Sequence, residues 1–250
     1  TEVAAWRNEV VGSRMYSKDS SGIDMNDIYR YGGYYTQDEI REVVNYAAQR
    51  NIMVLPEIEL PGHSGAVLAA YPELSCRGNA QLVPNKTIVG GLVDQHLVNM
   101  EFCAGKDESF AFLENVLGEV MTLFPSPYIH IGGDEVDKTH WKNCPLCQQR
   151  KIEMKLKDEE ELQSYFVKRI ERYLSKNSKK LIGWDEILEG GLPESSIVMS
   201  WRGEKGGIKA AQLRHEVIMS PSDPLYCNRY QDNPETEPWA ARFSINTLDR

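Results

Sequence analysis

Short apolar runs alternate with longer amphipathic segments along this chain of 250 residues. Apolar runs of about four to eight residues are typical of parallel strands that are buried on both faces. Five such runs predict strands at residues 52–56, 128–131, 181–184, 197–201 and 217–220.

The amphipathic segments predict helices. Thr36 and Glu39 form a capping-box pattern, and apolar residues then recur at helical spacing as far as Ala48. Three further helices are predicted at residues 110–124, 158–174 and about 205–213. Between the first and second helices, residues 76–107 are rich in glycine, asparagine and other polar residues and predict a long loop.

Strands that alternate with helices imply right-handed βαβ units and a parallel sheet. No GxGxxG pattern follows the first strand, so a dinucleotide-binding Rossmann fold lacks its fingerprint. Active sites of (β/α)8 barrels lie at the carboxyl ends of the strands. Polar residues follow the predicted strand ends here, namely Glu57, Glu59, His63, Asp134, Glu135, Asp185, Glu186 and Arg202. The pattern favours an α/β fold of the (β/α)8 TIM-barrel type, with an open doubly wound sheet as the alternative.

The composition and net charge of the chain limit the kinds of molecule that it is expected to bind. Hydrophobic residues at 41% and charged residues at 26% are ordinary for a soluble globular protein, and the length suits one large domain. The formal charge of −9 disfavours nucleic acid and anionic membrane surfaces. No apolar run is long enough to cross a bilayer, and residues 1–7 show no signal-peptide pattern. A neutral substrate is compatible with the net negative charge of the chain.

The five cysteines include one CxxC pair, Cys144 and Cys147. An odd number of cysteines cannot pair completely within one chain. Zinc needs about four ligands, and neither a second CxxC nor a nearby pair of histidines completes a set. A structural role as free thiols or a local disulfide is therefore favoured, with metal binding and a redox site as alternatives.

The sharpest chemical signal is the sequence HIGGDE at residues 130–135. Two glycines let the backbone turn after a strand, and Asp134 and Glu135 then emerge together, so one site can offer both an acid and an anion. The sequence PEIELPGH at residues 56–63 ends a predicted strand and brings in His63. Trp184, Trp201 and Tyr226 follow or end buried runs, and aromatic rings among carboxylates suit a sugar. Each motif alone is also compatible with a surface acidic pair, a structural histidine or core filling.

Together these motifs resemble glycoside hydrolase family 20. The matching segments keep the family's order from about residue 5 to residue 231: YGGYYT at 31–36, PEIELPGH at 56–63, HIGGDE at 130–135, GWDE at 183–186, Ser200-Trp201, and Ser220-Pro221 with Tyr226. The resemblance implies that residues 1–250 are a single catalytic (β/α) barrel domain, truncated at both ends, with about strands three to seven present.

The resemblance also implies an exo-acting β-N-acetylhexosaminidase that removes terminal β-linked N-acetylglucosamine or N-acetylgalactosamine with retention of configuration. In that family the substrate's own 2-acetamido oxygen attacks the anomeric carbon and forms an oxazolinium intermediate. No cofactor or catalytic metal is expected, and export to the periplasm, cell surface or lysosome is implied.

The resemblance further assigns roles to individual residues. Glu135 would be the general acid and base, Asp134 would orient the acetamido group, and His63 would tune Glu135. Trp184 and Trp201 would wall the acetamido pocket, and Tyr226 would hydrogen-bond the acetamido oxygen. Asn228 stands where the family usually has Asp at a position that contacts outer sugar hydroxyls.

Three rival functions are weighed against this one. A non-catalytic carbohydrate-binding protein is disfavoured by the intact acidic pair. A metal-dependent hydrolase would use His63, His130, Asp134 and Glu135 as ligands. A chitinase-like enzyme would need a differently spaced acidic motif, which the chain lacks.

Overall fold

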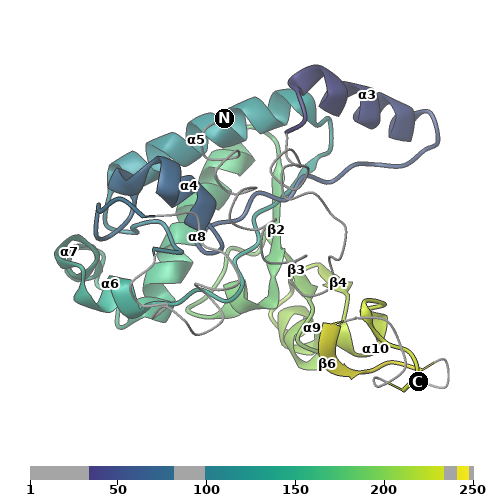
Figure 1. Cartoon of the computed structure of the whole chain (residues 1–250). Coiled ribbons are helices and arrows are strands. Elements are labelled where there is room, and N and C mark those ends of the chain that lie inside the picture. Colours follow the sequence, from purple (N-terminus) through teal and green to yellow (C-terminus); the bar gives the residue numbers. More distant parts are fainter. Residues whose placement is uncertain (1–33, 82–98, 234–240, 248–250) are drawn as a thin grey trace, which may run out of the picture.

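A parallel sheet forms the centre of the molecule. The computed structural model describes residues 34–81, 99–233 and 241–247. Within these residues the main sheet contains, in chain order and all parallel, β1 (Tyr128–His130), β2 (Lys180–Trp184), β3 (Ile197–Ser200) and β4 (Val217–Met219) (Figure 1). Ile129 pairs with Leu181, and Gly183 pairs with Val198. Four of the five predicted strands are thereby confirmed.

The first predicted strand differs from the prediction. Residues 52–56 form no regular strand, and the chain joins the edge of the sheet slightly later, through a parallel bridge between Glu57 and His130. The amide of His130 donates to Pro56 O (3.0 Å), and the amide of Ile58 donates to His130 O (2.9 Å). Ile52 and Met53 are 58% and 53% exposed, so the predicted burial of this run is wrong, because its pairing with β1 begins only at Pro56.

A similar correction applies to the last predicted strand. Ile218 and Met219 in β4 are exposed, although the run predicts burial on both faces. Among the described residues β4 is hydrogen-bonded to β3 on one side only. An edge strand of this kind keeps part of its surface open, and the apolar run alone does not show which strand lies at the edge.

The described residues contain the four helices predicted from the sequence and four others that were not predicted. They are α3 (Gln37–Ala48), α4 (Gly65–Ala70), α5 (Asp107–Leu123), α6 (Thr139–Asn143), α7 (Pro145–Glu153), α8 (Glu159–Lys176), α9 (Glu204–Gln212) and α10 (Ser222–Leu225), with 3-10 turns η1 (Pro72–Leu74) and η4 (Asp185–Leu188). The capping box of Thr36 and Glu39 opens α3. The apolar stripe of α3 is only partly covered, since Val44 is buried and Val43 is exposed.

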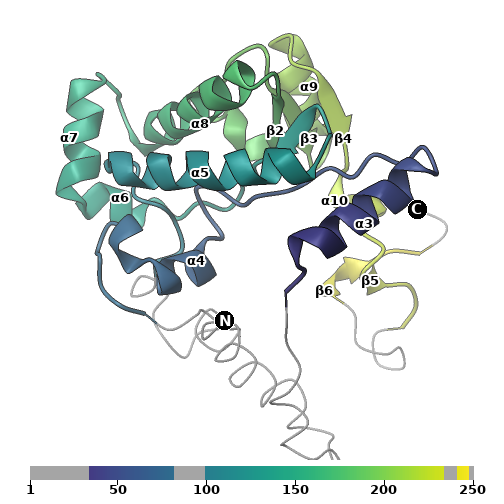
Figure 2. The ribbon, with the colours of Figure 1, turned by 90° about the horizontal axis from the view of Figure 1, so that it is seen from above.

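The core lies between the sheet and two long helices. In Figure 2, α5 and α8 run side by side. The rings of Phe110 in α5 and Phe166 in α8 lie with their centroids 4.7 Å apart. Leu162, Ile170 and Leu174 on the inner face of α8 are buried, as their spacing predicts. This apolar layer fixes the positions of the strand ends that carry polar residues.

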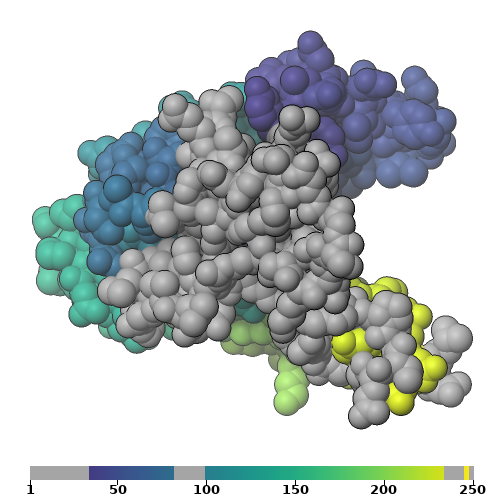
Figure 3. Space-filling model, in the orientation of Figure 1, coloured from purple at the N-terminus to yellow at the C-terminus, as the bar shows by residue number. Residues whose placement is uncertain are grey.

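Smaller elements gather at the two ends of the molecule. The short helices α4, α6 and α7 adjoin at one end, away from the pair formed by β5 (Arg229–Tyr230) and β6 (Ala241–Ile245) (Figure 1, Figure 3). The described parts of the predicted long loop, residues 76–81 and 99–106, contain no helix or regular strand. No helix among the described residues combines the length and apolar character needed to cross a bilayer.

The strand order favours a barrel. Strands that follow one another in sequence also lie next to one another, all parallel, with α8 between β1 and β2 and α9 between β3 and β4. A doubly wound sheet reverses its strand order at a switch point, and the described part of this sheet shows no reversal. The arrangement is that of consecutive units of a (β/α) barrel, whose carboxyl-terminal strand ends face one common side.

Candidate active site

A cavity of about 480 Å³ lies at the carboxyl ends of the strands. It is lined by Glu57, Glu59, His63, Asp134, Glu135, Trp184, Trp201 and Tyr226. These side chains come from five separate segments of the chain. The structure therefore brings together every site residue predicted from the sequence except Asn228, which is exposed and does not line the cavity.

The turn after β1 depends on its two glycines. Gly132 and Gly133 have φ values of 67° and 92°, which favour glycine. A Cβ on Gly132 would lie 1.9 Å from a carboxylate oxygen of Glu59, and one on Gly133 would lie 2.5 Å from a methyl carbon of Ile187. The glycines thus allow the backbone to pass between neighbouring strand ends. Glu135 itself has a positive φ of 48°, a backbone conformation that is uncommon for residues other than glycine.

His63 approaches the acidic pair from the loop after the first sheet segment. Its Nε2 lies 3.2 Å from Asp134 Oδ2 and 3.5 Å from Glu135 Oε2. Gly62 makes this approach possible, because a Cβ there would lie 3.1 Å from the backbone oxygen of Asp134. The hydrogen bond with Asp134 raises the pKa of His63 to about 9, against the opposing effect of burial. His63 is therefore a cation that bridges both carboxylates at neutral pH.

Glu57 and Glu59 extend the acidic wall, and the sequence analysis assigned them no role. Burial, with the nearby charges of Asp134 and Glu57, raises the pKa of Glu59 to about 7. A hydrogen bond from His130 lowers the pKa of Glu57. The spacing of Glu57 and Glu59 could have indicated that they share a site with His63. Residues two apart on an extended segment face the same side, and His63 follows in the same motif.

Two tryptophans form the walls of the cavity, and carboxylates hold both. The indole N–H of Trp184 donates to Glu57 (2.9 Å), and its ring packs edge-on against His130 with centroids 4.8 Å apart. The indole N–H of Trp201 donates to Glu186 (3.0 Å). These contacts fix both ring planes before any ligand arrives.

Tyr226 completes the aromatic wall. Its ring is stacked with that of Trp201, with centroids 6.4 Å apart and planes 15° apart. Burial raises the pKa of Tyr226, and the charge of Asp134 adds to this effect. The phenol therefore keeps its proton and can donate a hydrogen bond into the cavity.

Asp185, which follows Trp184, has a supporting position outside the cavity. It is buried, and it accepts hydrogen bonds from the amide of Trp201 (3.0 Å) and from Nε of Arg202 (2.7 Å). Hydrogen bonds between the residues that follow β2 and those that follow β3 thus join the ends of these two strands.

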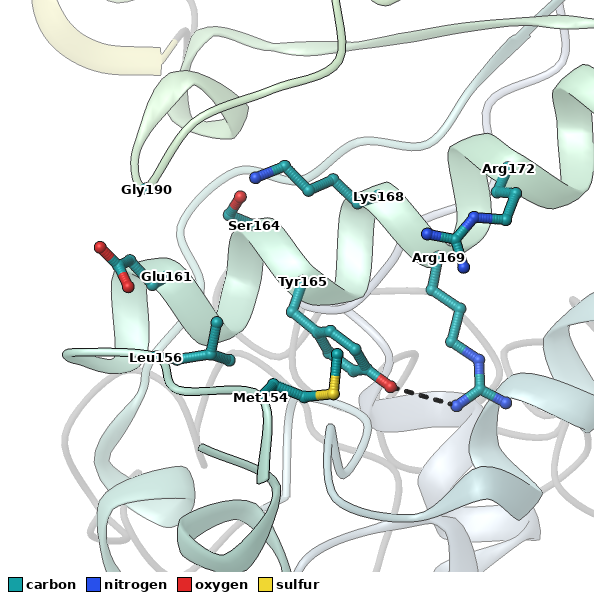
Figure 4. A pocket seen from close by; sticks show the side chains of 9 residues that line it. All are labelled: Met154, Leu156, Glu161, Ser164, Tyr165, Lys168, Arg169, Arg172 and Gly190. Atoms are coloured by element: carbon teal, nitrogen blue, oxygen red, sulfur yellow. Dashed lines mark hydrogen bonds between the residues drawn. The ribbon is translucent and has the colours of Figure 1, made fainter. Parts of the chain in front are cut away.

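A second hollow, of about 610 Å³, lies beside α8 (Figure 4). Lys168, Arg169 and Arg172 line part of it, and Arg169 donates to the hydroxyl of Tyr165 (3.4 Å). Arg169 is also paired with Asp107. None of the site residues predicted from the sequence lines this hollow.

Comparison with known proteins identifies the family. A model described as the catalytic domain of glycosyl hydrolase family 20 matches residues 1–249. The chain belongs to glycoside hydrolase family 20. The resemblance drawn from the sequence motifs is thereby confirmed.

Curated relatives in family 20 carry the name β-hexosaminidase. One from Porphyromonas gingivalis is 51% identical over 241 residues, which cover 96% of this chain and 30% of that protein. Another, from Vibrio furnissii, is 33% identical over 252 residues, which cover 100% of this chain and 39% of that protein. The chain thus spans less than half the length of these two relatives.

Solved structures of family 20 confirm the barrel. An exo β-N-acetylglucosaminidase from Vibrio harveyi, solved in complex with N-acetylglucosamine, matches with a TM-score of 0.75 and 31% identity, over 88% of this chain and 33% of that one. A β-N-acetylhexosaminidase from Bacteroides fragilis matches with a TM-score of 0.68 and 34% identity, over 92% of this chain and 42% of that one. The described residues therefore fold as part of a (β/α)8 barrel.

Membership of family 20 disfavours the metal-dependent rival, although three of its four proposed ligands lie close together. One oxygen or nitrogen atom each from His63, Asp134 and Glu135 lies within 4.8 Å of the others. The fourth proposed ligand, His130, is buried and lies outside this group, with its Nδ1 3.0 Å from the amide nitrogen of Gly132 and 3.2 Å from Glu57 Oε1.

Proposed function

We propose that the protein is an exo-acting β-N-acetylhexosaminidase that hydrolyses terminal, non-reducing β-linked N-acetylglucosamine or N-acetylgalactosamine with retention of configuration. The supporting observation is that Asp134 and Glu135 meet at His63 within a cavity walled by Trp184, Trp201 and Tyr226. Membership of family 20 supports the same reaction.

The position of the acidic pair favours a nucleophile from the substrate. In the two-carboxylate mechanisms the carboxyl groups flank the scissile bond from opposite sides of the sugar. Here Asp134 and Glu135 are consecutive, and both lie within 3.5 Å of one His63 nitrogen, so they share one wall. Glu57 is held by the indole N–H of Trp184. The 2-acetamido oxygen of the substrate is then the nucleophile, and its high effective molarity makes a neutral amide competent.

Exposure supports different roles for the two carboxylates. The Glu135 side chain is 59% exposed, whereas that of Asp134 is 16% exposed. A general acid must reach the leaving oxygen and then take a proton from water, which suits the open position of Glu135. Asp134, deeper in the cavity and paired with the His63 cation, is suited to orient the acetamido N–H and stabilise the positive charge that develops on the oxazolinium ring.

The aromatic residues would hold the acetamido group. Trp184 and Trp201 enclose the space beside Asp134, and their indole N–H groups are held by Glu57 in the cavity wall and by Glu186. The Tyr226 hydroxyl would donate a hydrogen bond to the acetamido oxygen and aim it at the anomeric carbon. Asn228 would meet the outer hydroxyl groups of the sugar from the rim of the site.

Replacement of Glu135 by Gln in the full-length protein tests this function. Turnover of a disaccharide, whose leaving group needs protonation, should fall by about 10²–10⁴-fold, because the amide cannot donate the proton. Turnover of an aryl glycoside with an activated leaving group should fall less. The matched control is Glu194→Gln at an exposed position outside the cavity. Equal disaccharide turnover in E135Q and the control would contradict the assignment of Glu135 as the acid, and binding without turnover in the wild type and the control would favour a binding protein.

A further inference from the structure

Four of the five cysteines converge away from the catalytic cavity. They are Cys76 after η1, Cys103 before α5, and Cys144 and Cys147 at the start of α7. Their sulfur atoms all lie within 4.8 Å of one another. Cys103 and Cys147 are fully buried, Cys144 is nearly so, and Cys76 is half-buried. The two partners that the CxxC pair lacks in the sequence are therefore supplied by segments far from it along the chain.

The sulfur separations match a single tetrahedral metal ion. Cys76–Cys147, Cys103–Cys144 and Cys103–Cys147 have Sγ–Sγ distances of 3.7, 3.8 and 3.6 Å. Four sulfurs bound tetrahedrally to zinc at about 2.3 Å lie about 3.8 Å from one another. A disulfide needs about 2.05 Å and joins only two sulfurs. A cluster of several irons binds each thiolate to a different iron and spreads the sulfurs further apart.

The backbone around Cys144 is arranged to receive a thiolate. Cys144 is the N-cap of α7, and Pro145 occupies the first turn of this helix. A helix N-terminus favours negative charge on a nearby sulfur.

The chain packs tightly beside the sulfurs. A Cβ on Gly105 would lie 2.3 Å from the backbone of Leu146 and 2.5 Å from the nitrogen of Cys147. Glycine therefore lets the loop that carries Cys103 lie directly on the turn that carries the CxxC pair. Several buried thiolates need a compensating cation, and a metal ion bound between the four sulfurs would supply it.

We propose that Cys76, Cys103, Cys144 and Cys147 form a structural site for one Zn²⁺ ion. Four thiolates with no open position are typical of structural rather than catalytic zinc. On binding, each thiol loses its proton to solvent and each thiolate donates an electron pair to the ion, with no redox change.

The position of the site gives it a mechanical role. The loop of Cys103 is joined to the loop of His63, because the amide of Phe102 donates to Pro61 O (2.9 Å). It is also joined to the segment that follows Glu135, because the indole of Trp141 donates to Phe102 O (2.9 Å). A metal at the four cysteines would lock these two loops together and thereby hold His63 against the acidic pair.

Metal analysis of the full-length protein, produced with zinc and iron both available, tests the site. We expect one zinc per chain, and X-ray absorption at the zinc edge should show four sulfur neighbours at about 2.3 Å. Iron in place of zinc, a chain without metal, or disulfides among these four cysteines would overturn the proposal. Disulfides are a serious competing outcome for these cysteines. The family resemblance predicts an exported protein, and disulfides form readily in the compartments outside the cytosol.

Variants at the half-buried cysteine separate metal binding from folding. Histidine can replace one cysteine in a structural zinc site, so Cys76→His should keep one zinc while its absorption spectrum changes to three sulfurs and one nitrogen. Cys227→Ser, at an exposed cysteine outside the cluster, is the matched control and should keep four sulfurs. An unchanged four-sulfur shell in C76H would contradict the proposal. These readouts do not depend on glycoside hydrolysis, so they stand even if the proposed function fails.

Discussion

At the scale of single residues, the two neighbouring carboxylates differ in their surroundings. Asp134 lies largely inside the cavity and forms the shorter contact with His63, whereas Glu135 is open to solvent and has a strained positive φ. Adjacent acidic residues thus acquire different capabilities from the backbone turn between them. The proposed division into an orienting anion and a proton-transferring acid rests on this difference.

Replacement of Asp134 by Asn should have two linked effects. The pKa of His63, raised to about 9 chiefly by Asp134, should fall toward its ordinary value when the charge is removed. Turnover of N-acetylglucosaminides should fall by about 10²–10³-fold, the usual effect of losing one electrostatic contact to a transition state. An NMR titration of His63 measures the first effect and steady-state kinetics measures the second. A His63 pKa that stays near 9 in D134N would show that another group holds the proton.

The buried carboxyl of Glu59 should make stability depend on pH. Its pKa is about 7 in the folded state and about 4.5 in the unfolded chain, so the folded state binds more protons between these values. Its contribution to stability is fully present below pH 4.5 and is lost as the pH rises through about 7. Glu59→Gln should therefore lose less stability than the wild type between these pH values. Denaturant unfolding across this range measures it, and parallel curves for wild type and E59Q would contradict the prediction.

The sequence predicted most of the individual site residues. Motifs such as HIGGDE are local, so Asp134, Glu135, His63 and the two tryptophans could be found by reading along the chain. Glu57 and Glu59 gained their importance from the register that places Glu57 opposite His130. The cysteine cluster was missed for a similar reason, because its contacts join residues 41, 44 and 71 positions apart.

At the scale of elements, helices followed local signals and strands did not always do so. Capping residues and apolar spacing act within one segment, so α3, α5, α8 and α9 formed close to the predicted positions. Strand burial depends on which neighbours a strand acquires in the sheet. The runs at residues 52–56 and 217–220 were therefore predicted to be more buried than they are.

The N-cap of α8 offers a test at this scale. The Asp158 carboxylate accepts from the amide of Glu161 (2.9 Å) at the start of the helix that covers the sheet. Asp158→Ala should lower the free energy of unfolding by about 0.5–2 kcal/mol, whereas Asp158→Asn, which also caps well, should lower it much less. Chemical denaturation of the three proteins measures the difference. Equal losses in both variants would contradict a capping role.

At the scale of the whole molecule, the barrel brings distant motifs to one side. Segments around residues 57, 134, 184, 201 and 226 share a cavity because consecutive parallel strands end on the same face. The strand–helix alternation predicted this arrangement, and family membership confirms the barrel. The net charge of −9 is compatible with a neutral sugar in a cavity whose wall is largely acidic.

The role of the substrate's acetamido group is tested most directly by paired substrates. The full-length protein should be given an aryl β-N-acetylglucosaminide and the β-glucoside with the same leaving group, and kcat/KM should be compared. We expect kcat/KM for the acetamido substrate to be higher by at least about 10³-fold. The glucoside has no internal nucleophile, and water from the solvent cannot match the high effective molarity of an acetamido group held next to the anomeric carbon. Comparable kcat/KM values for the two substrates would contradict the account.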